Sequence, residues 1–78
     1  MKFTVYAIRS IKKNYTYVGL TGNLEKRLFY HNNGYEKTTK SYSPFELIFA
    51  ENFETRMEAR EKEKFLKSGV GRKFLKSL

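Results

Sequence analysis

A few polar side chains in this 78-residue sequence could take part in proton transfer, phosphate binding or metal binding. A phenol can act as a base, but its pKa of about 10 requires positive charge nearby. An arginine can hold phosphate oxygens in a forked contact, a histidine can exchange a proton near neutral pH, and a carboxylate can bind a divalent cation. The side chains that we single out are Tyr6, Tyr17, Arg27, His31 and Glu63.

Composition excludes several other chemistries. The chain has no cysteine, so it cannot form disulfides, thiolate zinc sites, iron–sulfur clusters or a cysteine nucleophile. It has one histidine, which excludes a histidine-rich metal cage. Any metal would therefore rest on carboxylates and water, and the absence of cysteine fits a reducing compartment.

A hairpin is expected to hold the two tyrosines. Residues 3–9 alternate as a strand, with Tyr6 on the face opposite to Val5 and Ala7. Residues 15–20 are rich in aromatic and β-branched side chains and form the second strand after a polar turn. Neighbouring antiparallel strands bring side chains on one face together, so Tyr6 and Tyr17 should be adjacent, although the sequence does not fix the register.

A first helix is expected from Leu24 to Asn33. Asn23 can cap its first turn, and Gly34 can end it in the left-handed conformation. Its apolar stripe, which includes His31, should face the sheet. Arg27 lies one turn before His31, so both should point along the border between core and solvent.

Beyond this helix, residues 34–43 are polar and basic, contain Lys37 and Lys40, and predict a mobile loop. Pro44 closes the loop, and residues 45–52 form a short apolar run that predicts a third strand buried on both faces.

A second helix should begin with a capping box formed by Thr55 and Glu58 and continue to about Ser68, with Gly69 as its stop. A last short helix, residues 72–78, should return to the core the apolar side chains Phe74, Leu75 and Leu78.

Glu63 is the anomaly of the second helix. It falls in the apolar stripe formed with Ala59, Leu66 and Val70. A carboxylate among core-facing positions is costly unless something pairs with it. A structural partner is available in a neighbouring cation, one of Arg56, Arg60 and Lys67.

Each of the other candidates also has an ordinary explanation. A tyrosine in a strand usually packs with its hydroxyl reaching water. A histidine near the end of a helix is often favoured there by the helix dipole, and Arg27 could pair with Glu25 or another surface acid.

The whole chain predicts one small domain, residues 1–78, of α/β (α+β type) class: a three-stranded, mainly antiparallel sheet flanked by helices in the order β-β-α-β-α-α. Sixteen Lys and Arg against eight acids give a net charge of +8, which attracts polyanions but also serves solubility. No apolar run approaches the roughly 20 residues of a membrane span, and the start does not resemble a signal peptide. We therefore expect a soluble cytoplasmic protein.

The order and spacing of these residues resemble the GIY-YIG endonuclease family, from near Phe3 to past Lys67. In size the chain is similar to small stand-alone members and to the nuclease module at the front of the bacterial excision-repair incision subunit. The first signature keeps only its tyrosine, and the second is a close fit. The matching segments are Thr4-Val5-Tyr6, Tyr17-Val18-Gly19, Thr21, Asn23-Leu24, Arg27-Leu28, His31-Asn32, Gly34, Pro44-Phe45-Glu46-Leu47, Glu58-Ala59, Glu63 and Lys67.

The resemblance implies a metal-dependent endonuclease that cuts a nucleic-acid strand in one step by in-line attack of water. Glu63 would be the sole protein ligand of one Mg²⁺ or Mn²⁺ ion, and Arg27 would contact the phosphate. Tyr17 resembles the family's general base, and Tyr6 would assist it or orient the water. His31 would position Tyr17 or the water, or contact the phosphate. Three lysines would follow the nucleic-acid backbone without reading bases: Lys37, Lys40 and Lys67.

Two other functions remain open. The chain could be a nucleic-acid-binding module that keeps the fold without catalysis, or a protein-interaction domain with an incidental basic surface. DNA is favoured over RNA as the nucleic acid, and DNA repair is one candidate role. Any targeting would come from a protein partner or from self-association.

Overall fold

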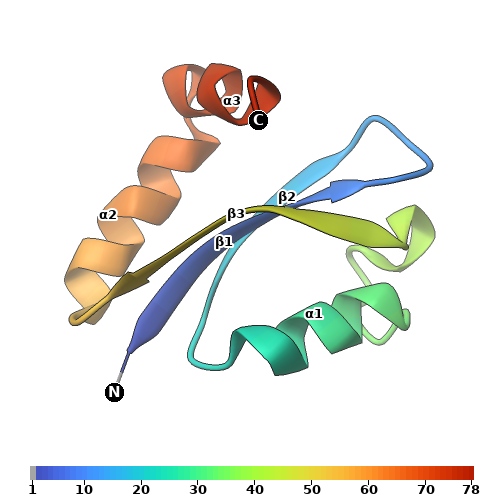
Figure 1. Ribbon diagram of the computed structural model, residues 1–78, viewed down its shortest axis with the longest axis horizontal. Helices are drawn as coiled ribbons and strands as arrows, with labels where there is room; N and C mark the ends of the chain where they lie inside the picture. Colours follow the sequence, from blue (N-terminus) through green and yellow to red (C-terminus); the bar gives the residue numbers. More distant parts are fainter. Residues whose placement is uncertain (1) are drawn as a thin grey trace.

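The sheet is built around one central strand. In this computed structural model, which describes residues 2–78, β1 (Phe3–Ser10) pairs antiparallel with β2 (Thr16–Thr21) on one side and β3 (Phe45–Phe53) on the other. The remaining elements are α1 (Leu24–Asn32), the short 3₁₀ helix η1 (Lys40–Tyr42), α2 (Arg56–Lys67) and α3 (Gly69–Lys76). The predicted α+β class and the element order are confirmed, and every strand pairing is antiparallel (Figure 1).

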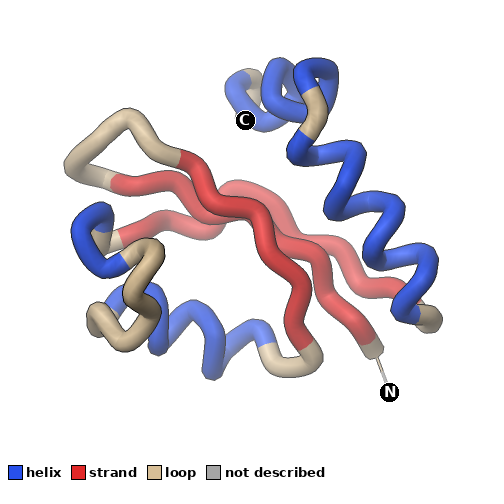
Figure 2. The backbone as a smooth tube through the Cα atoms, turned by 180° about the vertical axis from the view of Figure 1, so that it is seen from behind, coloured by secondary structure: helices blue, strands red, loops and turns tan. Residues whose placement is uncertain are grey.

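Each face of the sheet carries its own small core. On one face, Tyr6 and Ile8 of β1 pack with Phe45 and the apolar side of α1. On the other face, Val5 and Ala7 pack against α2 and α3. Figures 1 and 2 show α1 on one side of the sheet and α2 with α3 on the other. The predicted alternation along residues 3–9 is therefore confirmed, and it supplies both cores from a single strand.

The predicted burial of the third strand is wrong. β3 is an edge strand, because β1 takes the central position. Of its residues only Phe45 is fully buried, and Leu47 is 45% exposed. An apolar run of this length predicts a strand but does not tell a central strand from an edge strand.

Local signals fix the ends of α1 as predicted. The Asn23 side chain accepts a hydrogen bond from the Lys26 amide. Gly34 has a φ of 74°, in the left-handed region, and the Tyr35 amide donates back to the Tyr30 carbonyl. These contacts satisfy backbone groups that the helix ends leave free.

The junction between α2 and α3 differs from the prediction. Thr55 caps α2 as expected, but the Glu58 carboxylate accepts from the Thr55 hydroxyl. At the other end, Ser68 closes α2 and its side chain accepts from the Gly71 amide, which starts α3 at Gly69. The last helix therefore begins three residues before the predicted position 72.

The earlier start of α3 changes which side chains reach the core. Leu75 is buried, but Phe74 and Leu78 are 40% and 46% exposed, and Val70 is 68% exposed. The predicted core positions of these three residues are therefore wrong. No helix described within residues 2–78 has the length and apolar character needed to cross a membrane.

Candidate active site

The hairpin brings the two tyrosines together. Tyr6 lies opposite Gly19, and Ile8 lies opposite Tyr17, so the tyrosines are diagonal neighbours on the α1 face. Their ring centroids are 6.2 Å apart. The adjacency predicted from the hairpin is confirmed.

Gly19 makes room for the Tyr6 phenol. A Cβ on Gly19 would lie 2.5 Å from the Tyr6 hydroxyl and 2.6 Å from the ring carbon that bears it. These distances are well inside van der Waals contact, so any larger residue at position 19 would push the phenol aside. The glycine of the second signature therefore has a packing role toward the tyrosine of the first.

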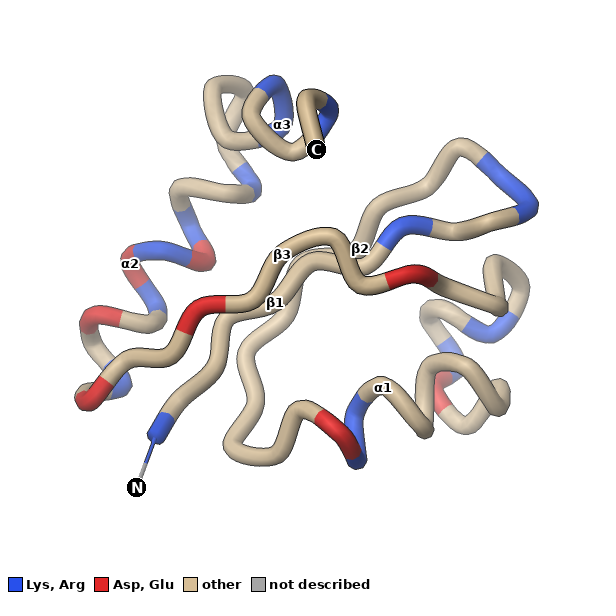
Figure 3. Tube along the Cα trace, in the orientation of Figure 1, with Lys and Arg blue, Asp and Glu red and all other residues tan. Residues whose placement is uncertain are grey.

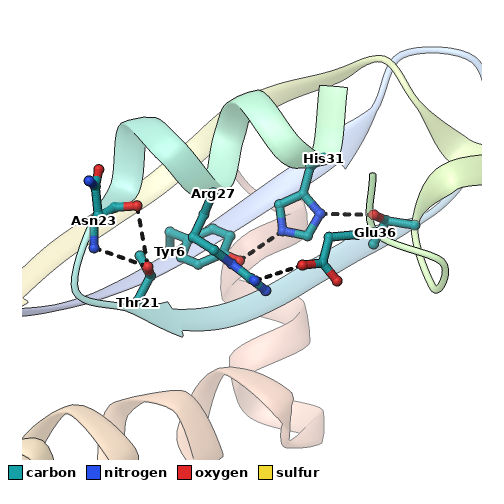
Figure 4. A network of polar contacts seen from close by, with 7 residues as sticks. Tyr6, Thr21, Asn23, Arg27, His31 and Glu36 are labelled. Carbon is teal, nitrogen blue, oxygen red and sulfur yellow. Dashed lines mark hydrogen bonds and ion pairs between the residues drawn. The ribbon is translucent and has the colours of Figure 1, made fainter. Parts of the chain in front are cut away.

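His31 is fully buried on the sheet-facing side of α1, so its predicted place at the border between core and solvent is wrong. Its Nε2 lies 2.9 Å from the Tyr6 hydroxyl (Figure 4). Its Nδ1 lies 2.8 Å from the Thr39 hydroxyl. The Tyr17 ring also lies close, with its centroid 4.9 Å from that of His31. Both ring nitrogens thus have partners, as a buried imidazole requires.

Burial determines the protonation states of His31 and Tyr6. It lowers the pKa of His31, and the positive charge of Arg27 lowers it further. It also raises the pKa of the Tyr6 phenol, although Arg27 opposes that shift. At neutral pH the site therefore holds a neutral imidazole hydrogen-bonded to a neutral phenol.

Arg27 extends from α1 along the same face. Its Nη1 lies 2.6 Å from the Glu36 carboxylate in the loop after α1, so of the acids considered from the sequence its partner is Glu36 and not Glu25 (Figure 4). The Arg27 Nε is buried and has no hydrogen-bond partner within residues 2–78. The guanidinium also lies close enough to the Tyr6 hydroxyl to act against the burial that raises the pKa of that phenol.

The loop after α1 is held more firmly than predicted. Thr39 is fully buried and bonds to His31, and η1 follows it directly. Neither Thr39 nor Glu36 was singled out from the sequence, because nothing in the spacing of a polar loop marks which member turns inward. Lys37 and Lys40 of this loop are exposed.

Glu63 belongs to the opposite face of the sheet from the cluster of Tyr6, Tyr17, Arg27 and His31. It projects from α2, which packs on the other face, and its side chain is only 13% exposed. Its carboxylate lies 3.1 Å from the Lys67 Nζ and 3.6 Å from an Arg60 Nη1. Two of the three cations considered from the sequence thus pair with Glu63, and both are themselves more than half exposed.

The side chains around Glu63 limit how a metal ion could be bound there. Within residues 2–78, no three histidine or acidic side chains gather as a ligand cluster. A divalent ion at Glu63 would therefore have one protein carboxylate and complete its shell with water and substrate oxygens. This composition fits Mg²⁺, which gives up its waters reluctantly and often takes few protein ligands.

Known proteins resemble this chain in sequence. Residues 2–75 match the family model of the GIY-YIG catalytic domain. The chain is 36% identical over 76 residues to a UPF0213 protein of Staphylococcus saprophyticus, covering 96% of this chain and 92% of that protein. It is 47% identical over 57 residues to the UPF0213 protein YazA of Bacillus subtilis, covering 72% of this chain and 58% of YazA. The chain thus spans less than two thirds of YazA.

A solved structure agrees with the fold. The solution NMR structure of a UPF0213 protein from Bacillus halodurans matches with a TM-score of 0.59 at 28% identity, over 99% of this chain and 84% of that one. Together with the family match over nearly the whole chain, these similarities show that the protein belongs to the GIY-YIG family.

Proposed function

We propose that this protein is a divalent-metal-dependent endonuclease that hydrolyses phosphodiester bonds of nucleic acid, with DNA favoured over RNA. GIY-YIG catalytic domains are generally nucleases, and they generally use divalent metals. The observation that carries the proposal is the cluster of Tyr6, Tyr17, His31 and Arg27 on one face of the sheet.

The two tyrosines would have different roles. Tyr17 is half-buried, so water can reach its phenol, and it is the better candidate for accepting the proton of the attacking water. Tyr6 is fully buried with a raised pKa. If the His31 Nδ1–H donates to Thr39, then Nε2 accepts from Tyr6, and the Tyr6 oxygen keeps lone pairs to orient Tyr17 or the water.

Arg27 would bind the phosphate as charge develops on its oxygens. Its side chain is 31% exposed and only Nη1 is paired with Glu36, so the guanidinium keeps other N–H groups for a phosphate without first losing the ion pair. Glu36 would hold the arginine in place before substrate arrives.

Glu63 would hold Mg²⁺ or Mn²⁺, which when bound supplies charge neutralisation at the leaving oxygen. Lys67 and Arg60 are exposed surface cations, whose ion pairs contribute little to stability and can be exchanged. Because β2 is an edge strand, a substrate along its outer side can meet groups from both faces of the sheet.

Three exposed lysines would help to bind the nucleic acid. Lys37 and Lys40 beside α1 and Lys67 on α2 would contact the backbone of the nucleic acid without reading bases. A cytoplasmic location, a role in DNA repair, and targeting by a protein partner or by self-association belong to the same proposal.

Cleavage is the test. Purified protein is incubated with plasmid, branched DNA and structured RNA in Mg²⁺ or Mn²⁺, beside Glu63→Gln, Tyr17→Phe and, as a control on the same helix, Glu61→Gln. We expect Glu63→Gln and Tyr17→Phe to lose at least about 100-fold in rate, and Glu61→Gln to cut normally. Glu63→Gln should keep the melting temperature of the wild type.

One observation favours a second candidate, the nucleic-acid-binding module without catalysis. Glu63 is paired with two cations, as a purely structural acid would be. If wild type binds every substrate and cuts none, and Glu63→Gln melts much earlier, this second function is the correct one.

A further inference from the structure

A cleft lies between the outer edge of β2 and the two C-terminal helices. It has a volume of about 500 Å³ and is lined by residues 14–18 and by the helical residues Leu66, Lys67, Arg72, Leu75 and Lys76. Val18, Leu66 and Leu75 belong to the buried core and form its floor. This floor belongs to the core on the α2 side of the sheet, whereas Tyr15 and Tyr17, which also line the cleft, pack with the α1 core.

The rim of the cleft is positively charged. Lys67, Arg72 and Lys76 are exposed and line it, and no acidic residue is among its lining residues. Lys67 pairs with Glu63, whereas Arg72 and Lys76 take part in none of the ion pairs formed within residues 2–78. Figure 3 shows the basic segments on α3 and at the end of α2. Such a rim attracts an anionic chain.

The strand side of the cleft offers hydrogen bonds. The Tyr15 carbonyl accepts from the Ser10 amide, so it points toward β1. Backbone groups alternate along an antiparallel strand, and Thr16 and Val18 therefore turn their N–H and C=O groups outward. No other strand pairs with this side of β2 in the part of the chain that the structure describes. Free amides are donors that phosphate oxygens use.

The cleft also adjoins the site of chemistry. Tyr17 belongs to the candidate active site and lines the cleft. Lys67 lines the cleft and is paired with Glu63 one helical turn earlier. A chain that lies in the cleft would thus run directly past both Tyr17 and Glu63.

We propose that this cleft binds the sugar-phosphate backbone of the nucleic acid next to the bond that is cut, through Arg72, Lys76 and the outward amides of β2. The proposal rests on the proposed function for the identity of its ligand. When Lys67 turns to a phosphate, Glu63 keeps only its longer contact with Arg60 and one carboxylate oxygen becomes available to the metal, so backbone binding in the cleft and metal binding support each other.

The experiment measures binding without cleavage. Fluorescence anisotropy of labelled single-stranded and duplex DNA is recorded in EDTA over a salt series, for wild type and for Arg72→Gln/Lys76→Gln. The matched control is Lys64→Gln/Lys73→Gln, which removes the same charge from α2 and α3 at positions outside the cleft. We expect the cleft variant to lower the slope of log affinity against log salt by about two and the control to lower it less. Thermal melting checks that both variants fold.

The outcomes separate the cleft from the nuclease proposal. Loss of binding confined to the cleft variant supports the cleft even if wild type cuts nothing. Equal slopes for the cleft variant and its control overturn it, even if wild type is an active nuclease. A dimer that Thr16→Pro dissociates would show that a second chain covers the outer edge of β2, and this too would overturn the proposal.

Discussion

Among single residues, the chain of hydrogen bonds from Tyr6 through His31 to Thr39 is the most constrained. All three side chains are fully buried, and each distance in the chain is below 3 Å. A buried imidazole with both nitrogens hydrogen-bonded stabilises the fold only while it stays neutral. Protonation would place a positive charge where water cannot solvate it, which costs free energy. The stability of the protein should therefore depend on pH through His31.

The sign of this dependence follows from the lowered pKa of His31. Below the unfolded value of about 6.5, the unfolded state binds a proton that the folded state does not. The free energy of unfolding should then fall as pH drops from about 6.5 toward 5, by up to about 1.4 kcal/mol per pH unit. Urea denaturation at several pH values measures it, and His31→Gln should flatten the curve in this window. Equal slopes for both proteins would show that His31 is protonated in the folded state.

At the scale of elements, β2 is fitted to β1 through Gly19. The Tyr6 phenol occupies the space where a side chain at position 19 would lie. Gly22, in the turn that leads into α1, has open space where a Cβ would stand, with no atom within 4 Å, and its φ is not left-handed. A side chain can therefore be added at position 22 but not at position 19, although the two glycines are close in sequence.

Gly19→Ala should destabilise the protein by about 1–3 kcal/mol, because it overpacks the core around Tyr6. It should also abolish any nuclease activity, since the phenol must shift. Gly22→Ala is the control and should stay within about 0.5 kcal/mol of wild type. Urea midpoints and cleavage rates measure both effects. If Gly19→Ala were as stable and active as Gly22→Ala, the close fit of Tyr6 would be irrelevant to the site.

Elements with local signals were predictable, and tertiary placement was not. Alternation along residues 3–9, the Asn23 cap and Gly34 each act within a few residues, and each is confirmed. The exposure of β3 depends on strand order, which no single strand encodes. The start of α3 was missed because Ser68 ends one helix and caps the next.

The site shows the same limit. Spacing placed Arg27 and His31 on one side of α1, which is confirmed by their common position beside Tyr6 (Figure 4). The depth of His31 and its bond to Thr39 arise from how the loop folds back over α1. A periodicity within one helix carries no information about a contact with another segment.

For the whole molecule, the notable feature is that two thin cores share one strand. The chain has 78 residues and no disulfide, so each core is small. β1 contributes Tyr6 and Ile8 to one core and Val5 and Ala7 to the other. Loss of either core would remove support from β1, and hence from the opposite face.

This coupling predicts how a defect spreads. Leu66 is fully buried on the α2 side, so Leu66→Ala should destabilise the protein by about 2–5 kcal/mol, a large part of the roughly 5–15 kcal/mol typical of a domain. Met57→Ala on the same helix is the control, because Met57 is 74% exposed. Native-state hydrogen exchange would then follow the amides of α1, on the far side of the sheet.

We expect Leu66→Ala to lower protection in α1 by the same free energy as in α2, since both helices depend on β1. Protection in α1 that stays at the wild-type level would mean that the hairpin and α1 fold without α2. The cluster of Tyr6, Tyr17, Arg27 and His31 would then be a unit of its own, to which Glu63 docks from a separately stable helix pair.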